Sequence, residues 1–268
     1  MMVSTAGNPG NATDATRERI ERIRREHFPQ VDFSRTPDAI VAASFLRSRL
    51  TSVFQPIVEA GSERLVGRQG LLRVFDGAGA AVAPWGLFAQ AASDADLVQL
   101  DRLARTLHAI NYLRTADTGT SLFLHVEPRL LSSVRADHGA WFAEVLEALG
   151  LSTRHVTIVL PAAAVEDPVT FVRAAISYRI RGYRVAARIQ SPGSAELSHL
   201  LLAEPHFVAI DAPAGPEIAP TARLVADLSR QAIRTIARRV ESDAHAGAAR
   251  SAGFHLLQGW HLAPRPAP

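Results

Sequence analysis

The residues of this sequence that could do chemistry follow the ends of strand-like runs. Three of them are arginines, Arg73, Arg188 and Arg238, and a guanidinium group can hold a phosphate through two parallel hydrogen bonds. Two acids in similar positions, Asp211 and Glu241, could instead form a buried ion pair with Arg73, and the sequence leaves both interpretations open. The other polar side chains in such positions are Gln69, His125, Glu127 and Gln258.

Several common kinds of catalytic site lack their residues. The chain has no cysteine, which excludes disulfides, thiolate metal sites and cysteine nucleophiles. His125 could supply one nitrogen ligand, but one ligand makes no metal site, and a lone histidine at a strand end is more often a core residue. The sequence contains no G-x-S-x-G elbow, no P-loop and no GxGxxG motif. It therefore gives no support to a serine hydrolase or to a nucleotide-binding loop.

The charge of the chain is modest and spread along it. Its 268 residues include 29 basic and 26 acidic side chains, and every basic one is an arginine because the sequence contains no lysine. A net charge of +3 over this length predicts no strong field for nucleic acid or for a membrane surface. No apolar run is long enough to cross a bilayer, and the first residues do not form a secretory signal. We expect a cytoplasmic protein without a nucleic-acid or membrane partner.

The first part of the chain differs in composition from the rest. Residues 1–13 are rich in small and polar side chains, and we expect a disordered tail there. Residues 14–36 are interpreted as a charged lead-in helix and linker, because Ile20 and Ile23 are the only apolar anchors of that helix. A single globular domain over residues 37–268 is expected to follow.

The domain is expected to begin with a helix over residues 36–50. A threonine N-cap followed by a proline at the first helical position is a typical helix start. Three strand-like runs follow, over residues 53–59, 64–67 and 70–75. Residues 94–113 carry leucine and isoleucine at spacings of three or four, which predicts a long amphipathic helix.

After residue 120 the chain alternates between strand and helix. The strands are short apolar runs, such as residues 121–126 and 155–160, and a helical pattern follows each. This cadence predicts an α/β fold with parallel strands and right-handed crossovers. With the early strands counted, the units suffice for a (β/α)8 TIM-type barrel, and a doubly wound open sheet is the alternative. In such a barrel the working groups lie at the carboxyl ends of the strands.

Motifs along the chain resemble those of one bacterial family. They are FQPIV at 54–58, GLLR at 70–73, LFLHVEP at 122–128, FVAID at 207–211 and QGW at 258–260. In order and spacing they are similar to the EAL domain of cyclic di-GMP phosphodiesterases, over about residues 50–266. The resemblance implies a TIM-type barrel. In active members it also implies that two divalent cations, held by acidic and amide side chains, help hydrolyse one phosphodiester of cyclic di-GMP.

The positions that the resemblance assigns to metal binding and catalysis hold other residues here. The glutamate of the signature tripeptide falls at Gln69, and a second ligand glutamate falls at Val159. The first aspartate of the Asp-Asp-Phe-Gly stretch falls at Arg188, the catalytic lysine at Ala209 and the general base at Arg238. A valine offers no ligand, and two permanent positive charges repel cations. We therefore expect no catalytic residue, no metal and no cofactor.

Some residues of the family pattern remain. Leu71 ends the signature tripeptide, and Glu241 is the second glutamate of the general-base motif. Gln258 keeps the family spacing from the lost base, which supports the register of the comparison. His125 stands in the place of a ligand asparagine.

Two functions fit this pattern of loss and retention. The first is a catalytically inactive EAL domain that binds a regulatory protein partner in cyclic di-GMP-linked control of motility, adhesion or secretion. The alternative is a receptor that binds cyclic di-GMP without metal and without hydrolysis. Residual phosphodiesterase activity is a third interpretation, which the lost ligands disfavour. By analogy with EAL barrels, which often pair, a homodimer is compatible with either function. The candidate ligand-binding residues are Gln55, Leu71, Arg73, Arg188, Arg238, Glu241 and Gln258.

Overall fold

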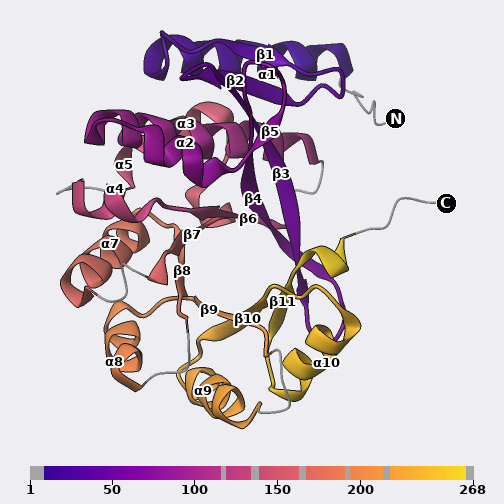
Figure 1. Cartoon of the computed structure of the whole chain (residues 1–268), viewed down its shortest axis with the longest axis vertical. Helices are drawn as coiled ribbons and strands as arrows, with labels where there is room; N and C mark the ends of the chain where they lie inside the picture. The colour runs from indigo at the N-terminus through magenta and orange to yellow at the C-terminus, as the bar shows by residue number, and fades with distance from the viewer. Residues whose placement is uncertain are drawn as a thin grey trace, which may run out of the picture.

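A computed structural model (Figure 1) describes residues 9–115, 119–133, 139–162, 167–190, 194–213 and 218–263. Its strands belong to one sheet. They are β1 Phe33–Arg35, β2 Val41–Phe45, β3 Ser48–Glu59, β4 Leu65–Phe75, β5 Ala81–Val82, β6 Ser121–His125, β7 Val156–Leu160, β8 Arg184–Arg188, β9 Phe207–Asp211, β10 Arg234–Arg238 and β11 Leu256–Gln258.

Helices connect most of these strands. The α-helices are α1 Pro9–His27, α2 Pro84–Gln90, α3 Asp94–Tyr112, α4 Pro128–Ser133, α5 Ala140–Leu149, α7 Pro168–Ile180, α8 Ser194–Ala203, α9 Ala219–Arg230 and α10 Asp243–Ser251. The 3-10 helices are η1 Leu113–Thr115, η2 Thr153–His155 and η3 Trp260–Leu262. In the described part of the chain, no helix combines the length and the apolar character needed to cross a lipid bilayer.

Eight of the strands close into a barrel. Around the ring the order is β3, β11, β10, β9, β8, β7, β6 and β4, and β4 pairs with β3 to close it. β3 runs antiparallel to both of its neighbours, whereas neighbours among the other seven strands run parallel. Figure 1 shows α7 to α10 around the outside of this ring. The predicted (β/α)8 barrel is confirmed, and the doubly wound open sheet is wrong because the ring is closed.

Apolar side chains fill the middle of the barrel. Successive residues of a strand face opposite sides, so alternate residues point inward. Phe123 of β6 and Phe207 of β9 meet there, with ring centroids 5.5 Å apart. Val159 and Ala209 belong to the same buried cluster. Its members are Ile57, Phe123, Val159, Ala186, Phe207, Ala209, Ile236 and Leu256.

The helix expected over residues 36–50 is wrong. This stretch instead contains β2 and the start of β3, which pair as an antiparallel hairpin with Phe45 opposite Ser48. The two-residue turn between them is made by Leu46 and Arg47, both with positive φ, at 46° and 62°. Such a turn matches the twist of the strands but usually contains asparagine or glycine. The sequence therefore carried no turn signal, and the Thr36-Pro37 pair suggested a helix start instead.

The lead-in segment is packed against the domain. Ile23 of α1 is fully buried, and Phe28 packs against Trp141 at 5.7 Å between ring centroids. Arg19 also donates a hydrogen bond to the carbonyl of Leu149, at 3.2 Å. Helix α1 begins at Pro9 and so includes the last part of the tail expected over residues 1–13, while residues 1–8 lie outside the described residues.

The amphipathic helix predicted over residues 94–113 is confirmed as α3, which ends at Tyr112. Its N-cap is Ser93, which forms a capping box with Asp96. One buried face of α3 carries an ion pair between Asp101 and Arg105, 2.5 Å apart, with both side chains about 4% exposed. Asp101 also accepts a hydrogen bond from the backbone N–H of Glu127, which follows β6, at 3.1 Å.

Candidate functional site

The carboxyl ends of the parallel strands form the mouth of the barrel. Gln69, His125, Arg188 and Arg238 lie at this level on β4, β6, β8 and β10. Gln55 of β3 lies at the same level because it pairs with Gln69 across the closing seam. A barrel of this kind carries its working groups at this end.

Three glutamines are joined at the seam where the barrel closes. The side-chain nitrogen of Gln258 donates to the side-chain oxygen of Gln55 at 2.8 Å, and also to that of Gln69. All three side chains are buried. The structure thus brings together two of the candidate residues, Gln55 and Gln258, and adds Gln69 to them. Among the described residues, no acceptor lies within hydrogen-bonding distance of the Gln69 side-chain nitrogen.

The part of the mouth formed by β8, β9 and β10 is positively charged. Arg238 donates a hydrogen bond from Nη1 to Oδ1 of Asp211 at 2.8 Å, and Arg239 lies 3.7 Å from the other oxygen of that carboxylate. The Arg238 side chain is 14% exposed. Its burial and the nearby charge of Arg188 lower the pKa of Arg238. Asp211 therefore neutralises part of a cluster that retains a positive charge.

Two histidines, one at the mouth and one on α3, are held neutral. Burial, together with the charges of Arg238 and Arg188, lowers the pKa of His125 to about 3. Burial alone lowers the pKa of His108, on α3, to about 3, and its Nδ1 is 2.8 Å from the hydroxyl of Ser52. His108 was missed by the sequence analysis, because nothing in the helical pattern distinguishes a histidine that faces the barrel from one in the core.

Arg73 lies further along β4, beyond the mouth. Its guanidinium carbon is 5.9 Å from the ring centroid of Trp260, and Nη1 donates to the carbonyl of Leu72 at 3.3 Å. Within the described ranges, no carboxylate forms an ion pair with Arg73: Asp211 pairs with Arg238 and Arg239, and Glu241 is exposed. The ion pair considered for Arg73 from the sequence is therefore absent from this part of the structure.

Two other candidate residues do not join the polar groups of the mouth. Leu71 precedes Arg73 by two residues on β4 and is partly buried. Glu241 follows β10, and its backbone N–H donates to Nδ1 of His245 at 3.3 Å. Glu241 is exposed and, among the described residues, forms no ion pair with the arginines of the mouth.

Gly70 follows Gln69 and makes a close approach to α3. A Cβ atom at this position would lie 2.7 Å from Cγ of the His108 ring and 3.0 Å from its Cβ. These atoms are near the helix backbone, and the ring is held by Ser52, so His108 cannot easily move aside. A glycine is therefore required here by space.

We expect Gly70→Ala to lower the free energy of unfolding by about 1–3 kcal/mol, the usual cost of overpacking a core. Gly86→Ala is the matched control, because a Cβ at Gly86 meets nothing within 4 Å and the residue lies inside α2. That control should be neutral or stabilising, by up to about 1 kcal/mol. Urea unfolding followed by circular dichroism measures both. Equal midpoints for the two variants would contradict the close approach.

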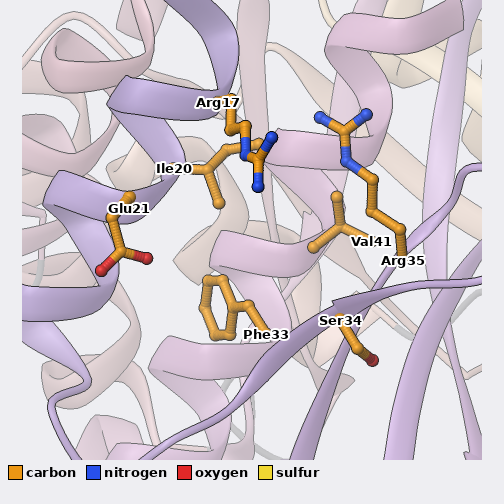
Figure 2. Close-up of a pocket in the computed structure, with 7 residues that line it drawn as sticks. All are labelled: Arg17, Ile20, Glu21, Phe33, Ser34, Arg35 and Val41. Carbon is orange, nitrogen blue, oxygen red and sulfur yellow. The ribbon is translucent and has the colours of Figure 1, made fainter. Parts of the chain in front are cut away.

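A separate hollow lies away from the mouth. It has a volume of about 640 Å³ and lies between α1 and β1. Figure 2 shows Arg17, Ile20 and Glu21 of α1 on one side, and Phe33 and Arg35 of β1 on the other. Its three charged residues are all exposed. None of the candidate site residues lines this hollow.

Comparison with known proteins identifies the domain. The sequence model of the EAL domain matches residues 38–265, which is most of the chain. The chain belongs to the EAL domain family. No curated protein sequence matches the chain.

Solved EAL structures have the same fold. The FimX EAL domain from Pseudomonas aeruginosa bound to c-di-GMP is 21% identical, with a TM-score of 0.67, over 80% of this chain and 90% of that one. Bacillus subtilis YkuI, in complex with c-di-GMP and calcium, is 20% identical, with a TM-score of 0.68, over 80% of this chain and 55% of that one. Klebsiella pneumoniae BlrP1, in a manganese and c-di-GMP complex, is 21% identical, with a TM-score of 0.67, over 88% of this chain and 58% of that one.

The donor set of this EAL domain does not suit the divalent cations that the family implies. Such cations take oxygen ligands, chiefly carboxylates. At the mouth, Val159 is packed among apolar side chains and Arg188 carries a positive charge. The amide oxygen of Gln69 already accepts a hydrogen bond from Gln258. The residues present therefore do not fit a pair of metal ions.

Proposed function

We propose that this EAL domain does not hydrolyse cyclic di-GMP and acts in cyclic di-GMP-linked regulation by binding a protein partner. The observation that carries the proposal is the content of the barrel mouth. Val159 and Ala209 belong to the buried apolar cluster, and Arg188 and Arg238 add positive charge at the strand ends. Each unit of positive charge placed 4 Å from one guanidinium group would be repelled by about 4 kcal/mol at an effective dielectric of about 20.

The general base is also absent from its position. A base must accept a proton from water, and an arginine stays protonated at any physiological pH. Arg238 uses its guanidinium to donate to Asp211. His125 is neutral, but burial and the charges of Arg238 and Arg188 lower its pKa to about 3, so it is a weak base. Neither residue replaces the glutamate that the family pattern has here.

The test is a turnover assay with the full chain. The protein is incubated with cyclic di-GMP and either Mg²⁺ or Mn²⁺, and the products are separated by chromatography beside an active EAL phosphodiesterase as assay control. We expect the yield of linear dinucleotide to equal that of a buffer blank. Metal-dependent formation of the linear product, removed by EDTA, would overturn the proposal.

The second candidate function is a metal-independent receptor for cyclic di-GMP. It is favoured by hydrogen-bond donors at the mouth that lack acceptors among the described residues, on Gln69, Arg188 and Arg238. Arg73 adds a guanidinium group that pairs with no described carboxylate. A phosphodiester could accept from these groups because charge-assisted hydrogen bonds to phosphate are strong.

Calorimetric titration with cyclic di-GMP in EDTA separates the two candidates. Binding by the receptor should weaken at least tenfold in Arg73→Ala and stay unchanged in Arg64→Ala, whose exposed side chain pairs with Glu59 away from the mouth. Absence of heat at high ligand concentration would exclude the receptor function.

A further inference from the structure

An apolar ridge on α7 separates two surface hollows. Ile176 and Ile180 lie one helical turn apart, and each lines both hollows, whose volumes are about 560 and 440 Å³. Ile180 is 80% exposed and Ile176 is 43% exposed. Large apolar side chains that are exposed together on a ridge mark an interaction surface more often than isolated ones do. We call these two residues the α7 ridge.

Arginines surround the ridge. The described residues that line the two hollows include five arginines and no acid. Arg179 forms an ion pair with Glu204 at 3.0 Å. Burial, together with the charges of Arg179 and Arg184, lowers the pKa of His206 at the edge of the first hollow. We call this set the arginine rim; its members are Arg154, Arg173, Arg179, Arg181 and Arg184.

This surface is at the far end of the barrel from the mouth. Arg184 begins β8 and Arg188 ends it, so the two residues are separated by the length of the strand, about 13 Å. Figure 1 shows α7 outside the barrel and beside α8, and these two helices are in contact. A macromolecule on the α7 ridge therefore leaves the mouth free.

We propose that the α7 ridge and the arginine rim bind an acidic amphipathic segment of a partner protein. The apolar residues of such a segment would cover Ile176 and Ile180, and its carboxylates would pair with the rim, because arginine matches carboxylate geometry through two hydrogen bonds. The inference rests on the proposed regulatory function and names the surface that performs it.

The chemistry of the ridge favours a protein segment over other polyanions. Single-stranded nucleic acid binds through exposed aromatic rings on which bases stack. Among the described residues that line these hollows, Tyr183 is the one tyrosine, tryptophan or phenylalanine, and it is 2% exposed. Two concave hollows beside the α7 ridge can accept the rows of side chains on a partner helix, whereas a flat lipid surface would not fill them.

The experiment uses the full chain and a fluorescent synthetic peptide. The peptide is helical, with leucine on one face at spacings of three and four and glutamate elsewhere, and its anisotropy is followed as protein is added. The variants are Ile180→Asp and Arg184→Glu. The matched control is the double variant Leu46→Asp/Arg47→Glu, which makes the same kinds of charge change in the exposed β2–β3 turn. Aspartate tolerates the positive φ of residue 46 better than leucine does.

We expect the acidic peptide to bind the wild-type chain and the control variant equally. Each ridge variant should weaken binding at least tenfold, and a peptide with lysine in place of glutamate should not bind. Equal affinities for the wild type and both ridge variants would overturn the inference. It would also be overturned by a single-stranded oligonucleotide or anionic vesicles binding this surface more tightly than the peptide, or by a dimer in sedimentation that Ile180→Asp dissolves.

The two proposals fail separately. Metal-dependent turnover of cyclic di-GMP would contradict the proposed function while leaving peptide binding at the α7 ridge untouched. If the ridge variants bound the acidic peptide as tightly as the wild type does, only the assignment of the binding surface to the α7 ridge and the arginine rim would be contradicted.

Discussion

Asp101→Ala is expected to lower the free energy of unfolding by about 3–5 kcal/mol, because it leaves a buried guanidinium group without its partner. Arg105 is 3% exposed, and Asp101 is the carboxylate with which it forms its ion pair. The change also removes the acceptor for the backbone N–H of Glu127. The segment that follows β6 therefore loses this hydrogen bond to α3. Chemical unfolding followed by circular dichroism measures the effect.

The matched control for this variant is Asp227→Ala. Asp227 pairs with Arg230 on the surface of α9, where both side chains are largely exposed. Exposed ion pairs contribute at most about 1 kcal/mol, so we expect this variant to unfold close to the wild type. If Asp101→Ala were no more destabilised than Asp227→Ala, the buried pair would not have the role assigned to it.

Gly259→Ala is the second substitution with a large expected effect. A Cβ atom at Gly259 would lie 1.9 Å from the carbonyl oxygen of Val240 and 2.5 Å from its carbonyl carbon. The two segments are held together, since Val240 donates to the carbonyl of Gln258 at 3.0 Å and accepts from His261 at 3.3 Å. With φ at 172° the backbone is extended, so the requirement for glycine comes from this close approach.

The alanine methyl group can be accommodated only if the backbone at residue 259 moves away from the backbone at Val240. We expect a loss of about 3 kcal/mol or more, at the upper end of the range for overpacked cores. Separation would also move Gln258, so the expected loss includes its hydrogen bonds to Gln55 and Gln69. Gly61→Ala is the control, because nothing lies within 4 Å of the Cβ position. A thermal unfolding midpoint of Gly259→Ala equal to that of Gly61→Ala would contradict this account.

The regular part of the fold could be predicted because its pattern is local. Strands such as β6 and β7 are short apolar runs between helical patterns, and α3 shows both its apolar spacing and its serine cap. The strand-helix alternation then restricts the topology to very few arrangements. These features do not depend on which distant residues they contact.

The N-terminal part could not be predicted because its structure depends on partners far along the chain. The β2–β3 hairpin turns at Leu46 and Arg47, whose side chains give no turn signal. The backbone N–H of Val41 also donates a hydrogen bond to Oδ1 of Asn111, on α3, at 2.8 Å. The docking of α1 through Ile23 and Phe28 needs the aromatic face of α5, which no local pattern reveals.

The positions of some candidate residues could be predicted, and their pairings only in part. Register along the barrel placed Arg188, Arg238 and Gln258 at the mouth, because each ends a strand of the same ring. Which carboxylate pairs with which guanidinium depends on distances across the ring, and Asp211 pairs with Arg238 and not with Arg73. Glu241 is exposed because the chain has already left β10 at that residue.

The most direct test of the central claim is a search for manganese in crystals of the protein. Crystals are soaked in Mn²⁺ with cyclic di-GMP, and anomalous diffraction is recorded at the manganese absorption edge. We predict no anomalous peak at the strand ends that carry Gln69, Val159 and Arg188, because apolar and positively charged side chains occupy them. Two peaks about 3.5–4 Å apart at this mouth, the spacing of a two-metal phosphodiesterase site, would contradict the account.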